Sequence, residues 1–176
     1  MDSSFSNSQI EVSSLPRISD IEFKGLHKDY LTVELIGSAI FWFISGSGAS
    51  VAIAVFWGTW PSWLSWLALG SLISIILSSF ILTILGFKRK KYALREHDII
   101  YKTGLIWRST TILPFNRIQH AEVQQGPVDR LFNLSKLKIY TAGGSGSDLS
   151  ISGLVPDEAN AMKHFILNKT SANEEE

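Results

Sequence analysis

The sequence predicts a two-helix transmembrane hairpin, followed by a small β-rich open barrel that a C-terminal helix caps. Three observations lead to this fold class. Residues 35–87 contain no Asp, Glu, Lys, Arg or His, and a neutral apolar block of this length suits a bilayer. Residues 92–152 form short alternating segments separated by turn residues, as in antiparallel sheets. Pro156 then begins a helical pattern with Asp157 and Glu158 in its first turn, where carboxylates suit the helix dipole.

The composition excludes several function classes. The 176 residues carry 16 basic and 16 acidic side chains, and this balance argues against a nucleic-acid binder, which needs a basic face. The absence of cysteine excludes disulfides, thiolate nucleophiles and cysteine-ligated metal sites. The first 30 residues hold no short apolar core of a signal peptide, so we expect the first membrane helix to remain in the mature protein.

The membrane hairpin is expected over residues 31–87, with one span at about 31–57 and the other at 63–87. At roughly 1.5 Å per residue, each span is long enough to cross a hydrocarbon core of about 30 Å. Pro61 breaks the short turn between the spans, and so short a turn makes the helices antiparallel neighbours. Indole side chains suit a membrane interface, and four of them surround the turn: Trp57, Trp60, Trp63 and Trp66.

The charges that flank the hairpin predict its orientation. The turn between the spans has no Lys or Arg, whereas four basic residues directly follow the second span: Lys88, Arg89, Lys90 and Lys91. Basic residues near membrane ends mark the cytoplasmic side. We therefore expect a multi-pass protein of the cell (plasma) membrane with both termini in the cytoplasm. The same four side chains could contact membrane lipids at the surface, although the topology alone accounts for them.

Small residues recur every four positions in the second span, at Gly70, Ser74 and Ser78. Such a stripe lets helix backbones approach closely. Two interpretations are open: the stripe packs the hairpin on itself, which is the commoner use, or it packs one protomer on another. The spans contain no ionisable residue of the kind that usually lines a transport path.

The soluble domain is expected over residues 88–168, between an N-terminal cytoplasmic tail of residues 1–30 and an acidic tail of residues 169–176. Its predicted strands are 92–95, 99–103, 106–113, 117–125, 137–141 and 149–152. Ile118 falls on the opposite parity to Ala121 and Val123, so the fourth strand should carry a bulge or bend. Residues 127–134 could hold one helical turn.

The second half of the N-terminal tail is of mixed polarity. Ile18, Ile21 and Leu26 could lie on one side of a short helix at the membrane surface. Apolar residues at this spacing more often serve ordinary packing, so both interpretations remain open.

Six segments of the soluble region follow one another in a recognisable order: Tyr92–Glu96, Ile99–Gly104, Leu113–Gln119, Val128–Leu134, Leu137–Gly144 and Gly153–Pro156. This series resembles the bacterial pleckstrin-homology-like (PH-like) domain of YdbS-type membrane proteins, in which two membrane helices also precede the domain. The resemblance covers about residues 26–167. It implies a PH-like open barrel attached to the cell membrane, and no established catalytic activity.

One departure concerns lipid recognition. Phosphoinositide-binding PH domains typically carry basic residues around the first hairpin loop. Here that loop is Glu96-His97-Asp98, and its two carboxylates would repel a phosphorylated headgroup. The resemblance in fold therefore does not carry phosphoinositide recognition to this chain.

No residue pattern indicates a catalytic, cofactor or metal site. His97 between two carboxylates fits a solvated turn better than a metal site, and the glycine-rich residues 143–148 lack the Lys of a phosphate-binding loop. Arg117 and Arg130 lie beside apolar neighbours. They could brace the barrel by pairing with carboxylates such as Glu122 and Asp129, or they could line a binding groove.

The sequence thus predicts a membrane-anchored cytoplasmic PH-like module that acts in binding, scaffolding or assembly and is not an enzyme. Its expected partners are membrane lipids and a second copy of itself or another PH-like membrane protein, as a homo-oligomer or hetero-oligomer. The alternative is a small membrane enzyme or a transport accessory subunit. A polar cluster facing the membrane would favour the alternative, whereas an apolar groove or an open edge strand would favour the module.

Overall fold

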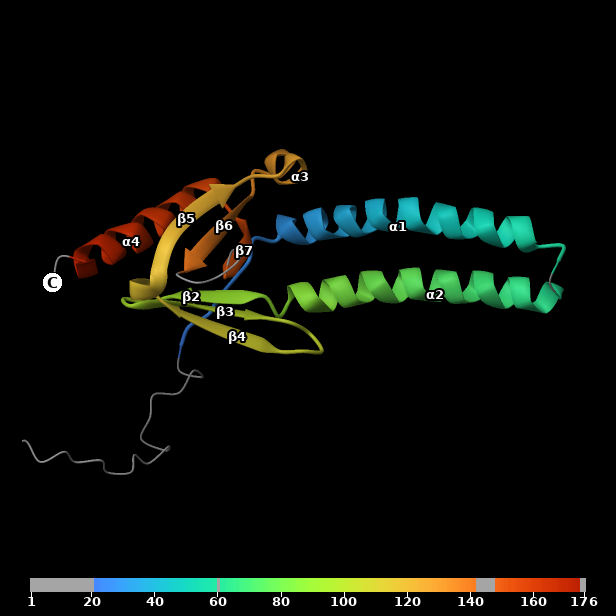
Figure 1. Cartoon of the computed structure of the whole chain (residues 1–176), viewed down its shortest axis with the longest axis horizontal. Coiled ribbons are helices and arrows are strands. Elements are labelled where there is room, and N and C mark those ends of the chain that lie inside the picture. The colour runs from blue at the N-terminus through green and yellow to red at the C-terminus, as the bar shows by residue number, and fades with distance from the viewer. Residues whose placement is uncertain (1–20, 60, 142–147, 175–176) are drawn as a thin grey trace, which may run out of the picture.

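Two long helices form a hairpin, and a β-rich domain lies at the open end of that hairpin (Figure 1). The computed structural model describes residues 21–59, 61–141 and 148–174. Helix α1 spans Asp29–Phe56 and helix α2 spans Ser62–Phe87. Both helices are long and apolar enough to cross a membrane, and their most apolar stretches are only 6% and 0% buried. This exposure separates them from the core helices of a soluble protein, which are mostly buried.

The two helices pack through one face of each. Gly46 and Ser65 are buried in this contact, and the Trp42 indole Nε1 donates a hydrogen bond of 2.7 Å to Ser79 Oγ. A Cβ atom on Gly46 would lie 3.7 Å from Ile76 Cδ1, an ordinary van der Waals distance, which places Gly46 against Ile76 of α2. Ser65, Ile76 and Ser79 share one face of α2 because their spacing fits about 3.6 residues per turn.

The small-residue stripe lies on the other face of α2. Gly70, Ser74 and Ser78 are all exposed, and a Cβ atom on Gly70 would meet nothing within 4 Å. The stripe therefore does not pack the hairpin on itself, which was the commoner of its two interpretations. The hairpin packs instead through the residues of the α1–α2 contact, namely Trp42, Gly46, Ser65, Ile76 and Ser79.

Seven strands form two antiparallel sheets in the described part of the chain. The first sheet has the order β1-β2-β3-β4, with β1 at Lys24–Gly25, β2 at Lys91–Leu94, β3 at Asp98–Thr103 and β4 at Ser109–Pro114. The second has the order β5-β6-β7, with β5 at Ile118–Gln124, β6 at Ser135–Thr141 and β7 at Leu149–Leu154. The 3₁₀ helix η3, Phe115–Arg117, joins the sheets, and the short helix α3, Pro127–Leu131, joins β5 to β6. The sheets do not close into a barrel, which agrees with the predicted open architecture.

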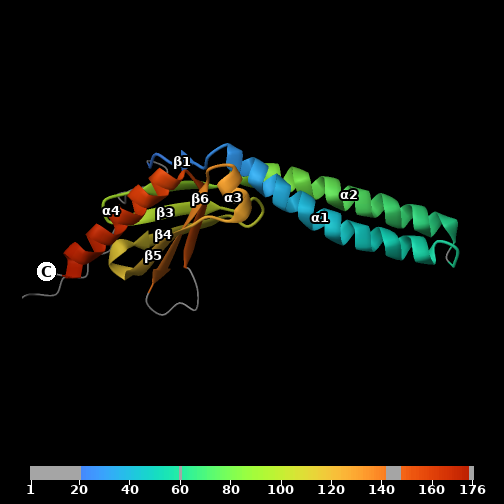
Figure 2. The ribbon, with the colours of Figure 1, turned by 90° about the horizontal axis from the view of Figure 1, so that it is seen from above.

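The core lies between the two sheets and helix α4, Pro156–Glu174. Strand β6 alternates strictly, with Leu137 and Ile139 buried between less buried neighbours, as expected of a strand with one face in the core. Helix α4 packs on β5 and β6 (Figure 2) and buries the side predicted for it, namely Ala159, Met162 and Ile166. Side chains at the domain end of the hairpin, Tyr30 and Phe87, also pack against this core. The hairpin and the domain therefore share packing.

The predicted strands all appear, with shifts at their ends. The expected bulge lies in β5, where the register with β6 shifts between Ile118 and His120. The expected helical turn is α3. Strand β4 begins at Ser109 and not at 106, because Gly104 turns the chain with a φ of 91° and leaves Ile106 and Trp107 in a loop.

Part of the expected N-terminal tail belongs to the domain. Residues 24–25 form β1, which pairs with β2, and Leu26 is buried in the core. The alternative of a surface helix is therefore wrong for Ile21 and Leu26, because an extended chain here gives Leu26 a place in the core. Ile18 and residues 142–147 lie outside the described residues.

Candidate functional site

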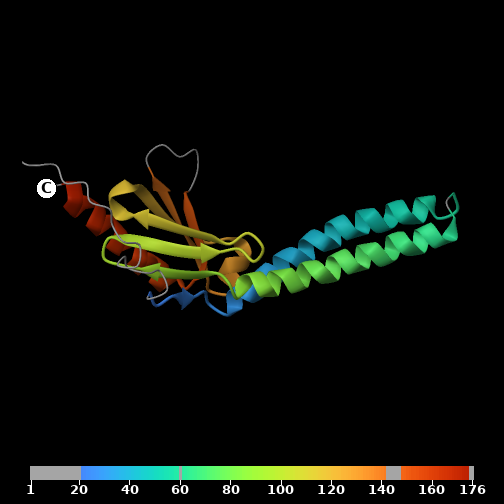
Figure 3. The ribbon, with the colours of Figure 1, turned by 90° about the horizontal axis from the view of Figure 1, so that it is seen from below.

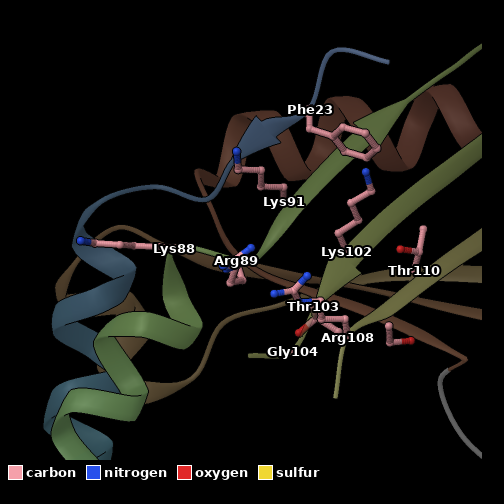
Figure 4. A pocket seen from close by; sticks show the side chains of 10 residues that line it. Phe23, Lys88, Arg89, Lys91, Lys102, Thr103, Gly104, Arg108 and Thr110 are labelled. Atoms are coloured by element: carbon pink, nitrogen blue, oxygen red, sulfur yellow. The ribbon is translucent and has the colours of Figure 1, made fainter. Parts of the chain in front are cut away.

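A cleft of about 560 Å³ lies where the hairpin joins the domain. It is bounded by the turn after α2, the start of β2, the end of β3 and the loop from β3 to β4, as Figure 4 shows. Ten residues line it: Phe23, Lys88, Arg89, Lys91, Lys102, Thr103, Gly104, Arg108, Ser109 and Thr110. We call this site the basic cleft.

The sheet topology brings these residues together. Strand β2 begins only four residues after α2 ends, and its antiparallel pairing with β3 sets Lys91 opposite Lys102. The next pairing sets Lys102 opposite Thr110 and Thr103 opposite Ser109. The segment that follows α2 is thus paired with the β-hairpin formed by β3 and β4, and the loop of that β-hairpin lies beside the start of β2.

Gly104 makes the sharp turn of that loop. Its φ of 91° is a conformation that residues with a Cβ atom rarely adopt, and a Cβ there would lie 1.8 Å from the carbonyl oxygen of Trp107. The turn gives Arg108 its place at the rim of the basic cleft. It also leaves Ile106 and Trp107 with 75% and 89% of their surfaces exposed.

The basic cleft has an excess of positive charge. Five of its lining residues are basic and none of them is acidic. Arg89 and Arg108 both line the cleft, as Figure 4 shows, and within the described chain neither side chain has a hydrogen-bond or ion-pair partner. Lys102 Nζ lies 3.6 Å from the centroid of the Phe23 ring, a cation–π contact. With hydroxyl groups from Thr103, Ser109 and Thr110 added, the lining offers donors suited to an anion.

Lys90 has a different role from its three basic neighbours. Its ammonium group pairs with the Glu34 carboxylate of α1 and lies 5.6 Å from the centroid of the Tyr30 ring. Both ends of the ion pair are mostly buried, so they fasten the turn after α2 to the start of α1. Of the four residues expected at the membrane surface, Lys88, Arg89 and Lys91 line the basic cleft, and Lys90 does not.

The junction between hairpin and domain is held on a second side by the Tyr30 ring. Gly153 has a φ of 72°, and a Cβ atom on it would lie 2.5 Å from Tyr30 Cγ. The backbone N–H of His27 donates a hydrogen bond of 2.9 Å to the Gly153 carbonyl, and Tyr30 lies 6.5 Å from Phe87 between ring centroids. The domain is therefore fixed to the base of the hairpin.

Arg117 and Arg130 do not make the bracing contacts considered for them. Both side chains are exposed, and neither has a hydrogen-bond or ion-pair partner in the residues that the structure describes. Asp129 instead accepts a hydrogen bond from Gly126 N at the start of α3, and Glu122 accepts one from the Tyr140 hydroxyl. Neither arginine lines the basic cleft.

The acidic first loop of the domain lies at the other end of β2 from the basic cleft. Arg95 makes two hydrogen bonds to the Asp98 carboxylate across this turn, and His97 is exposed. No group of three or more His, Cys, Asp or Glu in the described residues could hold a metal ion.

A third polar cluster fastens β1 to α4. Glu158 accepts hydrogen bonds from Lys24 Nζ, at 2.6 Å, and from the Tyr92 hydroxyl. Burial raises the pKa of Glu158, but the hydrogen bonds from Lys24 and Tyr92 outweigh this effect and lower the pKa below its ordinary value. Burial, together with the hydrogen bond to Glu158, raises the pKa of the Tyr92 hydroxyl. The cluster is one carboxylate held by two donors, which suits a structural role.

The sequence reasoning missed the part of the cleft that comes from β3 and β4. Lys102 and Arg108 have no distinctive local pattern, but the predicted hairpin register would have set Lys102 near Lys91. The pair Ile106-Trp107 was assigned to a strand. The preceding Gly104 was the available signal that these residues belong to a loop.

Comparisons with known proteins agree with this architecture. The bacterial PH domain family matches residues 30–170. The transmembrane protein YdbS of Bacillus subtilis (UPF0699) is 32% identical over 95 residues, which cover 54% of this chain and 58% of YdbS. YdbT of the same organism, also a UPF0699 transmembrane protein, is 27% identical over 94 residues, which cover 53% of this chain and 19% of YdbT. The chain thus matches less than two thirds of either relative.

A solved structure is also similar: a DUF1696 family protein with a pleckstrin-homology domain from Shewanella loihica. It shares 18% identity and a TM-score of 0.38, over 48% of this chain and 73% of that one. The family match covers most of the chain, including both long apolar helices and the β-rich domain. The chain therefore belongs to the bacterial PH domain family.

Proposed function

We propose that this protein is a membrane-anchored module that assembles with itself or with a related PH-like membrane protein and serves in binding or scaffolding. The hairpin crosses the plasma membrane twice, with both termini and the PH-like domain on the cytoplasmic side. The basic turn after α2 and the uncharged turn between the helices support this orientation.

The observation that carries the assembly proposal is the outward direction of the small-residue stripe on α2. Gly70, Ser74 and Ser78 are exposed, so the contact between α1 and α2 does not use them. Lipid tails pack no better against small side chains than against large ones, whereas a second helix can approach a stripe of small side chains closely. The outer edge of β4 adds a second free surface, because in the described chain β4 pairs only with β3.

The composition of the basic cleft argues against the alternative of a membrane enzyme. A polar cluster near the membrane was the feature expected to favour that alternative. The cleft has lysines, arginines and hydroxyl groups, but no carboxylate or histidine among its lining residues. Carboxylates and histidines are the commonest general acid–base groups near neutral pH, and an all-cationic lining with hydroxyl donors is better suited to holding an anion, so the lining favours binding over catalysis.

The test of assembly is crosslinking of the full-length protein in intact membranes, followed by size analysis in mild detergent. The variant Gly70→Leu/Ser74→Leu should reduce the crosslinked species severalfold while it still inserts, because Leu suits lipid but prevents close helix approach. The matched control is Ser47→Leu/Gly48→Leu, which places the same two changes at exposed positions of α1. A wild-type protein that remains monomeric in membranes and detergent, or equal losses in both variants, would contradict the proposal.

A further inference from the structure

The positive charge of the basic cleft is not neutralised by the described part of the chain. Arg89 and Arg108 line the same cleft, which has no carboxylate among its lining residues, and Lys88 and Lys91 are also exposed on this lining. Like charges that converge in this way repel, so the arrangement is most stable with an anion between them. An oxygen-rich anion such as a phosphate can accept hydrogen bonds from several guanidinium groups at once.

The position of the cleft indicates where that anion comes from. Lys88 and Arg89 directly follow Phe87, the last residue of the second candidate span. The loop between β3 and β4 lies on the side of the domain that faces the hairpin, beside the C-terminal end of α2, in both Figure 1 and Figure 3. The cleft therefore opens at the level at which a membrane helix leaves the hydrocarbon core, where lipid phosphates lie.

The tip of that loop is suited to the same environment. Ile106 and Trp107 are adjacent and both highly exposed, an arrangement that is unfavourable in water for two large apolar side chains. Tryptophan is enriched at membrane interfaces, where its ring meets the acyl boundary and its N–H meets water. An apolar tip beside a basic cleft is the combination that binds an anionic membrane surface.

We propose that the basic cleft binds the phosphate of an anionic phospholipid in the leaflet facing the domain, with Ile106 and Trp107 inserted at the acyl boundary. Arg89 and Arg108 hold the phosphate oxygens, and Thr103 and Ser109 offer further hydrogen bonds. The site is separate from the first loop of the domain, which lies at the other end of β2. This inference rests on the proposed membrane placement, but not on self-assembly.

Native mass spectrometry of the full-length protein, titrated with phosphatidylglycerol or phosphatidylcholine in detergent, tests the site. The wild-type protein should retain phosphatidylglycerol in preference to phosphatidylcholine. The variant Arg89→Gln/Arg108→Gln should lower phosphatidylglycerol affinity by about tenfold or more, because two charges near the headgroup are removed. Both side chains are exposed, so thermal unfolding should remain as in the wild type.

The charge-matched control is Arg117→Gln/Lys163→Gln. Arg117 lies at the other end of β4 from the basic cleft, and Lys163 lies on α4. This control should keep the wild-type lipid preference. Equal retention of the two lipids by the wild type, or equal losses in both variants, would overturn the proposal.

A failure of the lipid site can be distinguished from a failure of the assembly proposal. Loss of the lipid preference with crosslinking intact would overturn the lipid site alone. Loss of crosslinking with the lipid preference intact would overturn self-assembly alone.

Discussion

Single residues decide how tightly the domain meets the hairpin, and Gly153 is the clearest example. With a φ of 72°, it takes a backbone conformation that other residues adopt at a cost, and its missing Cβ makes room for the Tyr30 ring at the start of α1. A glycine followed by the helix-opening Val155-Pro156 looks in the sequence like an ordinary end of a strand. Its contact with a residue more than 120 positions earlier could not be read from local pattern.

We expect Gly153→Ala to destabilise the protein by about 2–4 kcal/mol, because strain at a positive φ adds to the clash with Tyr30. Thermal unfolding of the purified full-length protein would show this as a midpoint lower by several degrees. Gly25→Ala is the control within the same domain, since a Cβ atom on Gly25 would meet nothing within 4 Å. Similar midpoints for both variants would show that the junction tolerates the added methyl group.

At the scale of elements, regular patterns were predictable and contacts between distant segments were not. The alternation of residues 137–141 and 149–152 predicted β6 and β7, because strict period-two patterns reflect one buried face. Strand β1 escaped prediction, since two residues are too few to show any period. The basic cleft was found only in part for a related reason: Lys88, Arg89 and Lys91 form a visible run, whereas Lys102 and Arg108 join them only through the β2–β3 and β3–β4 pairings.

The attachment of β1 to α4 should depend on pH through Glu158. Its folded pKa lies below the ordinary value of 4.5, so its stabilising contribution is complete above that value and is lost as the pH falls through the folded pKa. Between about pH 5 and pH 3, the wild type should therefore lose thermal stability more steeply than Glu158→Gln. Parallel curves for the wild type and Glu158→Gln would assign the acid sensitivity to other groups.

At the scale of the whole molecule, the hairpin and the domain act as one body because their contacts are built into the core. Tyr30 and Phe87 pack against core residues, and the Glu34–Lys90 ion pair joins the start of α1 to the turn after α2. The sequence predicted both parts and their order, since a neutral apolar block and alternating strands are distinct patterns. It could not predict that the domain is fixed relative to the hairpin, because this depends on contacts that only the three-dimensional fold brings together. A fixed domain keeps the basic cleft and the Ile106-Trp107 loop at one height relative to the helix ends.

The orientation of this body in the membrane is open to a direct test, because the chain has no cysteine and each introduced thiol is unique. Ser62 is exposed at the start of α2, next to the turn between α1 and α2, and Asn160 is exposed on α4 in the domain. The basic residues after α2 should keep the domain in the cytoplasm, since translocating them across the membrane is disfavoured. In intact cells, a membrane-impermeant thiol reagent should therefore label Ser62→Cys and leave Asn160→Cys unlabelled. After the cells are permeabilised, both should react, which confirms that Asn160→Cys is accessible. Labelling of Asn160→Cys alone in intact cells would invert the topology. The basic cleft would then face the outer leaflet, and its lipid partner would have to be sought there.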